Sequence, residues 1–457
     1  MLAAAAAVYT GGDGPGGSGS GAGGPGRSTS GTGGSGRGGS GGSAARELAV
    51  GARLRAEGVP AELVAAAFTQ AELRHRAAAK FARAEEMFFT RAGLEQASSQ
   101  AAAEHRAARF AGRSRLADLC TGIGGDALAL APGREILLVD RDPVHLRMAA
   151  LNVAVHGAHR VDTLLADVRA ADLTGYDGVF VDPARRTGDR RLASRASEPP
   201  LPWCFALADR VAAVAVKAAP GLATDQVPQG WEIEFVADGR DLKEAVLFSP
   251  ALATTERRAT VLHPASSAHP ASGAHLGSPA HLAALGSAEA GIAFPDGPVS
   301  LVGVADPAEP DGPVAAPGRY LYDPSPAVTR AGLVGELARQ LGAWQLDPMI
   351  AFLSSDTPVA TPFARLLQIS ASLPFDVRRL AAELRGRGIG ALEIRRRGLA
   401  GDVDELRRRL LPRRRDLVAG GPAITLVMTR VRDEPWAFLC TNWPADDHTP
   451  PRPSVIE

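Results

Sequence analysis

The sequence predicts an α/β protein with a doubly wound parallel sheet in its central part, a helical segment before that sheet and an α+β region after it. Three observations predict this fold class. Short apolar or β-branched runs recur between residues 115 and 218, helical segments separate several of them, and a glycine-rich turn follows the first run. Strands and helices that alternate at this spacing form parallel sheets whose two faces are covered.

The chain begins with a tail, residues 1–44. Residues 11–43 are almost entirely Gly, Ser, Thr and Pro with an occasional Arg, and such a composition cannot bury enough apolar surface to offset chain entropy. We therefore expect disorder there. The apolar first ten residues lack the basic residues of a secretory signal, and no later stretch reaches about 18 uninterrupted apolar residues. We expect neither export nor a membrane span.

Residues 45–112 are predicted to form a helical N-terminal subdomain. Apolar residues recur there at three- and four-residue steps, as in Leu63, Ala66, Ala67 and Ala71. This period is typical of helices that bury one face.

Residues 113–262 are predicted to contain the doubly wound sheet. Helical segments are expected at 125–131 and at 142–157, where Asp-Pro begins and His-Gly ends the segment. Two runs that follow closely, 231–238 and 244–250, predict an antiparallel pair at the edge of the sheet. The expected strands before that pair are 115–120, 135–140, 163–167, 177–182 and 211–218.

The remaining chain is divided into three parts. Residues 263–317 are a low-complexity insertion and linker. For the biased stretch 263–282, a disordered insertion and a histidine-rich metal tract are the alternatives. Residues 318–443 form an α+β region, and residues 444–457 a tail. The expected elements of the α+β region are helices at 331–343, 377–388 and 402–411 and strands at 391–398 and 423–431.

Composition restricts the function classes. Fifty basic side chains balance fifty acidic ones among 457 residues, so nucleic acid must be bound by local patches rather than by a global field. The three cysteines, Cys120, Cys204 and Cys440, lie far apart without a CxxC pair. This argues against a disulfide framework and against a zinc site, and it indicates a reducing cytoplasm.

The glycine-rich turn, TGIGGD at residues 121–126, follows the first predicted strand, where doubly wound sheets bind ligands. It lacks the Gly-Lys-Ser/Thr of a nucleotide P-loop and does not match G-x-G-x-x-G. Asp118 precedes the turn, and Asp140 ends the next strand, where it can accept both hydroxyls of a ribose. The glycines that permit close approach of a ligand are Gly122, Gly124 and Gly125. Carboxylates here disfavour a pyrophosphate and favour a cofactor with a ribose and a cationic centre.

These residues resemble motif I of class I S-adenosylmethionine-dependent methyltransferases, which have a Rossmann-like fold. The resemblance implies S-adenosyl-L-methionine as the cofactor, with Asp140 at the ribose and Asp167, in LLADV, near the adenine. The alternative interpretation of Asp167 is a turn residue. Asp142, before Pro143, is interpreted as a helix N-cap.

The fourth predicted strand ends in Asp182-Pro183-Ala184-Arg185. Amino-group methyltransferases have Asp or Asn, Pro, Pro and an aromatic residue here, so the resemblance implies that Asp182 and Pro183 align the nucleophile. Ala184 and Arg185 depart from that pattern, although an arginine can stack on a base or pair with a phosphate. A strand-ending turn with solvated arginines is the alternative.

The wider pattern resembles bacterial methyltransferases with a C-terminal THUMP-like domain, related to trimethylguanosine synthases and RNA guanine-N2 methyltransferases. This resemblance is carried by the motifs above together with residues 91–110, 241–250, 320–334 and 392–398, and it covers roughly residues 45–262 and 318–443. It implies transfer of a methyl group to a base nitrogen of RNA. An inactive RNA-binding protein of the same fold and a small-molecule methyltransferase are the alternatives.

Three arginine clusters, 395–397, 407–409 and 413–415, predict phosphate contacts because the guanidinium fork donates two parallel hydrogen bonds. A solvated helix face in an arginine-rich chain is the alternative. The residues predicted to bind RNA are Arg395, Arg396, Arg397, Arg407 and Arg408.

Overall fold

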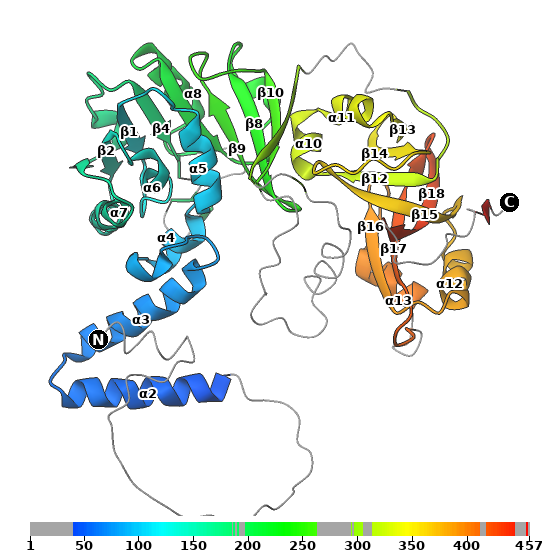
Figure 1. Cartoon of the computed structure of the whole chain (residues 1–457), viewed down its shortest axis with the longest axis horizontal. Helices are drawn as coiled ribbons and strands as arrows, with labels where there is room; N and C mark the ends of the chain where they lie inside the picture. The colour runs from blue at the N-terminus through cyan, green and yellow to red at the C-terminus, as the bar shows by residue number, and fades with distance from the viewer. Residues whose placement is uncertain are drawn as a thin grey trace, which may run out of the picture. The chain divides into compact units, whose positions relative to one another are not determined.

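The computed structural model describes residues 40–184, 197–262, 297–304, 313–411 and 417–443, and besides them residues 186–187, 190–191, 294 and 454–455. The chain divides into two compact units (Figure 1). The first unit comprises Met1–Ala184 and Glu198–Val214, and the second comprises Arg185–Ser197 and Ala215–Glu457.

Several sequence predictions lie outside the described residues. They are Arg185, the arginines 413–415, the tail up to residue 39, and most of the low-complexity insertion and of the last 14 residues. Across the described part of the chain, every helix is too short or too polar to cross a lipid bilayer. That part also holds no group of three or more His, Cys, Asp and Glu side chains suited to a metal ion.

The first unit begins with helices, as the sequence predicts. Side-chain hydroxyls cap two of them, because Thr90 accepts from the amide of Gly93 and Ser99 from that of Ala102. A small core that includes Leu54, Val64 and Phe68 lies between the first two. The helices are α2 (Ser40–Ala56), α3 (Ala61–Ala77), α4 (Arg91–Gln96) and α5 (Gln100–Ala108), with a 3-10 turn η1 (Ala84–Glu86).

Four parallel strands follow in the spatial order β4-β1-β2-β3. They are β1 (Arg115–Leu119), β2 (Glu135–Asp140), β3 (Arg160–Leu165) and β4 (Gly178–Val181), and all four are predicted from the sequence. Because β1 has β2 on one side and β4 on the other, the chain order reverses at β1. The carboxyl ends of these strands form the edge at which a doubly wound sheet binds its ligand.

Short helices connect these strands. The predicted helices 125–131 and 142–157 are α6 (Ala127–Leu130) and α7 (Pro143–Val155), and Asp142 caps α7 by accepting from the amides of Val144 and His145. The others are the 3-10 turns η2 (Val168–Ala170) and η3 (Leu207–Asp209) and the helix α8 (Leu201–Ala206). Strand β7 (Ala213–Ala218) begins in the first unit and ends in the second.

The second unit contains strands in the order β11-β10-β8-β9-β7. The predicted pair β8 (Glu232–Asp238) and β9 (Asp241–Phe248) is antiparallel, as expected. Its predicted place at the edge is wrong, because β10 (Arg257–Val261) pairs with β8, and β11 (Val299–Gly303) pairs with β10. Strand β11 lies in the stretch assigned to the linker. Because 37 residues separate β10 from β11 in the sequence, no local sequence pattern reveals that the two strands pair.

The second unit also contains an eight-stranded sheet with the main order β13-β14-β12-β15-β18-β17-β16. A two-stranded sheet of β5 (Arg186–Thr187) and β6 (Arg190–Arg191) and the 3-10 turn η4 (Thr224–Gln226) belong to this unit as well. The predicted helices 331–343, 377–388 and 402–411 are α11 (Val334–Leu341), α12 (Val377–Gly386) and α13 (Val403–Leu410), and α10 (Pro326–Ala331) precedes them. The strands are β12 (Tyr320–Pro324), β13 (Trp344–Asp347), β14 (Ile350–Ser355), β15 (Ala364–Pro374), β16 (Ala391–Arg396), β17 (Ala423–Val431), β18 (Glu434–Asn442) and β19 (Ser454–Val455), which pairs with β15.

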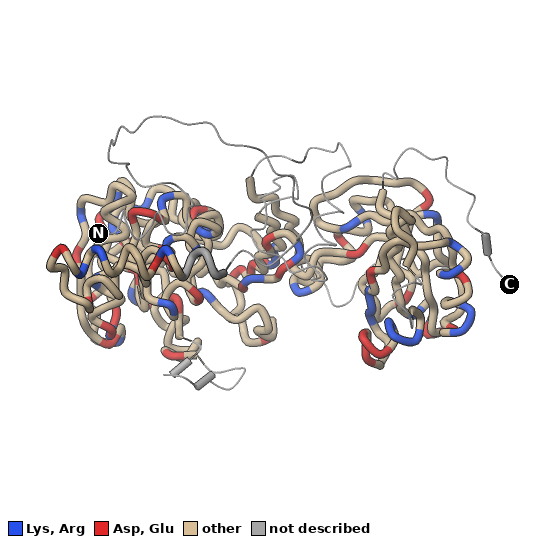
Figure 2. Tube along the Cα trace, turned by 90° about the horizontal axis from the view of Figure 1, so that it is seen from below, with Lys and Arg blue, Asp and Glu red and all other residues tan. Residues whose placement is uncertain are grey.

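Both faces of this sheet are packed. Leu426 belongs to a core that includes Leu380 and Leu384 of α12, whereas its neighbour Val427 belongs to a core with Phe352 and Phe438. Successive residues of a strand point to opposite faces, so the two cores lie on the two sides of the sheet. Basic and acidic positions are distributed along both units (Figure 2).

Candidate active site

Three aspartates lie at the carboxyl ends of neighbouring parallel strands. Asp140 is the last residue of β2, Asp118 is the fourth of the five residues of β1, and Asp182 follows β4 directly. The Asp182 amide continues the ladder by donating to the Leu119 carbonyl at 3.1 Å. The strands therefore bring these three sequence-predicted residues to one edge of the sheet.

Asp140 organises the glycine-rich turn. Its Oδ2 accepts from the Gly122 amide at 2.8 Å, and its Oδ1 accepts from the Asp142 amide at 2.9 Å. One carboxylate thus holds both the turn after β1 and the start of α7. A carboxylate oxygen has capacity for a second hydrogen bond, so both oxygens can still accept from a ligand hydroxyl.

The three glycines of the turn differ in their surroundings. Gly122 (φ +55°) faces open space, since a Cβ there would have no heavy atom within 4 Å. A Cβ at Gly124 (φ +82°) would lie 3.0 Å from the Cα of Ala149 in α7, and one at Gly125 would lie 3.2 Å from the Cβ of Ala97. Gly122 therefore leaves room for a ligand, whereas Gly124 and Gly125 let neighbouring segments pack closely.

Asp118 is 1% exposed, and its Oδ2 accepts from the Thr121 hydroxyl at 2.6 Å. Its Oδ1 has no hydrogen-bond partner among the described residues. Burial raises the pKa of the Asp118 carboxyl well above its ordinary value, and the Thr121 hydrogen bond opposes this. The carboxylates of Asp126, Asp182 and Asp140 add to the increase in pKa. Among the described residues, Asp118 thus has one oxygen without a donor and several carboxylates near it, and a cationic ligand would supply a donor and the opposite charge.

Cys120 lies between these aspartates with φ +61°, a left-handed conformation that is uncommon outside glycine. Burial raises the pKa of its thiol, and the carboxylates of Asp182 and Asp140 raise it further. A thiol that stays protonated is a poor nucleophile. The residue therefore serves the turn rather than covalent chemistry.

Backbone hydrogen bonds connect the residues that follow Asp182 to Glu198. Pro183 is buried, and Ala184 and Glu198 exchange two backbone hydrogen bonds, at 2.8 and 3.0 Å. Ala184, two residues after Asp182 in the chain, therefore lies side by side with Glu198.

Comparison with known proteins identifies the family. The chain is 35% identical over 376 residues to an uncharacterized S-adenosylmethionine-dependent methyltransferase of Mycobacterium tuberculosis strain H37Rv, across 79% of this chain and 90% of that protein. The chain belongs to the S-adenosylmethionine-dependent methyltransferases. The corresponding protein of M. tuberculosis strain CDC 1551 matches this methyltransferase to the same extent.

Two family descriptions match parts of the methyltransferase. A THUMP domain-like family matches residues 364–442, and a domain family of unknown function matches residues 39–77. The crystal structure of a proposed methyltransferase from Porphyromonas gingivalis W83 has the same fold, with a TM-score of 0.62 and 20% identity. The matched region spans 84% of this chain and 92% of the P. gingivalis chain. The resemblance to a class I methyltransferase with a THUMP-like region is therefore confirmed.

The cofactor of the family fits the chemistry of this edge. S-adenosylmethionine carries ribose hydroxyls, an ammonium and a sulfonium. Asp140 offers acceptors for the hydroxyls, Asp118 has an oxygen without a donor, and the surrounding carboxylates favour positive charge. The open space at Gly122 permits close approach of the ligand.

Asp167 follows β3 and is exposed, unlike the buried Asp118 and the half-buried Asp140 and Asp182. It caps η2 by accepting from the Arg169 amide at 2.9 Å, and this hydrogen bond lowers the pKa of its carboxyl. The Arg169 side chain contacts Asp167 at 3.1 Å and Glu198 at 2.6 Å, and its guanidinium lies 6.0 Å from the ring centre of Trp203. Arg169 thus connects Asp167, the predicted adenine-binding residue, to Glu198, which pairs with Ala184 two residues after Asp182.

Two features of this region are absent from the sequence predictions: Arg169, and a buried ion pair between Arg106 and Asp126. Arg106 of α5 is paired with Asp126, and Ser98 also donates to Asp126 at 3.2 Å. A signal for this pair is present in the sequence. Arg106 falls at helical spacing among Ala102, Ala103 and Ala107, the buried face of α5, where an arginine requires a carboxylate.

The predicted RNA-binding arginines do not form one surface. Arg395 and Arg397 both contact Asp323, at 3.4 and 2.9 Å. Arg396 points to the opposite face of β16 and is exposed. Arg407 of α13 donates to the Leu392 carbonyl at 2.7 Å, and the next residue, Arg408, is exposed.

Proposed function

We propose that this methyltransferase transfers a methyl group from S-adenosylmethionine to a base nitrogen of RNA. The observation that carries the proposal is the position of Asp182-Pro183 directly after β4, at the same edge as Asp118 and Asp140. A nucleophile held by Asp182 would face a cofactor held by the other two aspartates.

The cofactor supplies an electrophilic methyl group on a positively charged sulfur. In the proposal, Asp140 accepts from the ribose hydroxyls, Asp118 faces the cationic part, and Asp167 accepts from the adenine amine. The turn from Gly122 to Gly125 supplies backbone at close range. These roles are supported by the hydrogen bonds of Asp140 and by the unmatched oxygen of Asp118.

Asp182 has a positioning role in this proposal. The lone pair of an exocyclic base amine is delocalised into the ring, which makes the nitrogen a poor nucleophile. The Asp182 carboxylate and the Pro183 carbonyl accept the hydrogens of the amine and so direct its lone pair towards the methyl group. Orientation and electrostatic stabilisation of this kind account for much of the rate enhancement of enzymes.

RNA as the substrate class is supported by the C-terminal region. The THUMP domain-like match, residues 364–442, contains the arginines 395–397 and 407–409. Arginine suits phosphate recognition because its fork donates parallel hydrogen bonds. A cytoplasmic location accords with this substrate, and the free thiols of Cys120, Cys204 and Cys440 support a reducing compartment.

Mass spectrometry of nucleosides from cells that lack the protein tests the proposal. We expect one base-methylated nucleoside to disappear from total RNA and to return when the wild-type gene is restored. An unchanged set of RNA nucleosides would contradict the proposal. If the protein nevertheless bound RNA, it would be a non-catalytic RNA-binding protein, and a missing methylated metabolite would indicate a small-molecule methyltransferase.

A further inference from the structure

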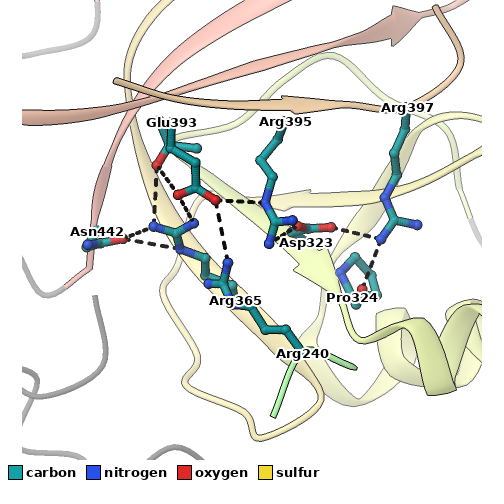
Figure 3. A network of polar contacts seen from close by, with 9 residues as sticks. Arg240, Asp323, Pro324, Arg365, Glu393, Arg395, Arg397 and Asn442 are labelled. Carbon is teal, nitrogen blue, oxygen red and sulfur yellow. Dashed lines mark hydrogen bonds and ion pairs between the residues drawn. The ribbon is translucent and has the colours of Figure 1, made fainter. Parts of the chain in front are cut away.

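Four arginines and two carboxylates gather in the second unit (Figure 3). We call these six side chains the arginine cluster. Asp323 of β12 is the register partner of Arg365 of β15, and Glu393 and Arg395 lie two residues apart on β16, on one face. The cluster consists of Arg240, Asp323, Arg365, Glu393, Arg395 and Arg397.

The two carboxylates are shared among the four guanidinium groups. Glu393 contacts Arg365 at 2.6 Å, Arg395 at 3.0 Å and Arg240 at 3.7 Å. Asp323 contacts Arg397 at 2.9 Å and Arg395 at 3.4 Å. Since arginine remains protonated, the cluster carries two more positive than negative charges.

Arg240 is the least compensated member. It lies in the turn between β8 and β9, its contact with Glu393 is the longest of the three, and its side chain is 47% exposed, whereas that of Arg365 is 15% exposed. Partial burial, together with the positive charges of Arg365 and Arg395, lowers the pKa of Arg240 to about 10. An anion beside Arg240 would relieve this repulsion.

We propose that the arginine cluster binds a phosphate group of the RNA substrate, with Arg240 as its solvent-facing donor. The inference rests on the proposed function and extends its binding surface to Arg240 and Arg365, which the arginine-rich motifs do not include. The excess of two positive charges favours an anion, such as a phosphate group of RNA, over a neutral ligand. Guanidinium forks also match the geometry of phosphate oxygens.

Fluorescence anisotropy tests the inference, with full-length protein and a dye-labelled single-stranded RNA of mixed sequence and about 20 nucleotides. The variant is Arg240→Gln and the matched control is Arg339→Gln, because Arg339 of α11 is 67% exposed and pairs with one glutamate, Glu336. Loss of one phosphate contact should lower the affinity about fivefold at about 0.1 M salt and reduce the log-log salt slope by about 0.7. The control should bind like the wild type.

The variant Arg240→Lys distinguishes phosphate binding from a purely structural role of Arg240. Lysine retains the charge, so the phosphate inference predicts that the salt slope returns to its wild-type value, whereas a purely structural role does not. All variants should bind S-adenosylmethionine with unchanged affinity. If Arg240→Gln keeps the wild-type affinity and slope, the phosphate inference is wrong while RNA remains the proposed substrate. If the wild type does not bind the RNA at all, the inference and the RNA substrate are both contradicted.

Discussion

At the residue scale, Asp140 links the structure of the turn to its chemistry. The same carboxylate that holds the amides of Gly122 and Asp142 is the proposed acceptor for a ribose. We predict that Asp140→Ala weakens S-adenosylmethionine binding about ten- to a hundredfold, because hydrogen bonds to a charged group contribute about 1.5–3 kcal/mol. Calorimetric titration measures this. Asp162→Ala, on the exposed part of β3, should bind like the wild type.

Asp118 gives the fold a pH dependence with a defined sign. Its folded pKa is raised above 3.8, so between the two values the folded state binds more protons than the unfolded state. The contribution of Asp118 to stability is therefore present below pH 3.8 and is lost as the pH rises towards the folded pKa.

Asp118→Asn removes this loss because the amide carries no charge. We predict that the free energy of unfolding of the variant, relative to wild type, increases as the pH rises from about 4 to 8. Urea denaturation at a series of pH values measures the difference. A difference that stays constant over this range would show that Asp118 is not destabilised by burial.

The sequence permits prediction of Asp118, Asp140 and Asp182 because each stands at the end of a strand with a strong apolar pattern. Parallel strands carry such residues to one edge whatever the details of packing. The hydrogen bond of Thr121 to Asp118 and the contacts of Arg169 depend on side-chain directions in a turn. Local sequence does not encode those directions.

At the element scale, the packing of α7 against the glycine-rich turn depends on Gly124. A matched control is Gly157, which has the same φ of +82° but open space around its missing Cβ. Gly157→Ala should cost about 1–2 kcal/mol for the left-handed backbone alone. Gly124→Ala should cost about 1–3 kcal/mol more, because its Cβ would meet the backbone of Ala149. Equal losses in urea unfolding would contradict this packing role.

The buried pair between Arg106 and Asp126 fixes α5 to the start of α6. We predict that Arg106→Met destabilises the protein by about 3–5 kcal/mol, because it removes the guanidinium from a buried carboxylate. The double variant with Asp126→Leu should recover much of the loss, since both charges are then absent. Thermal or urea unfolding of the three proteins measures both effects. A double variant as unstable as Arg106→Met would refute this explanation.

The pattern of elements was predictable where contacts are local. Strands β1 to β4 and the helix α7 follow from apolar runs, the Asp142-Pro143 start and the glycine punctuation. The pairing of β10 with β8 and of β11 with β10 was not, because β11 follows a long insertion. Strands β13, β14, β15 and β18 were not predicted either, since short apolar runs do not distinguish strands from helices.

At the scale of the whole molecule, the candidate active site and the arginine cluster lie in different units. The first unit holds Asp118, Asp140 and Asp182, and the second holds the THUMP domain-like match and the arginine cluster. The chain as a whole is balanced, with fifty basic and fifty acidic residues, so any affinity for RNA must arise from a local excess of charge. This explains why net charge alone does not predict the proposed partner.

Methyl transfer to RNA tests the central claim most directly. Purified protein is incubated with S-adenosylmethionine labelled in its methyl group and with RNA from cells that lack the protein, and the RNA is digested for nucleoside mass spectrometry. We predict label in a base-methylated nucleoside with the wild type and at least about a hundredfold less with Asp182→Ala, which still binds the cofactor. Label that is absent from RNA, or that Asp182→Ala transfers as well as the wild type, would contradict the account.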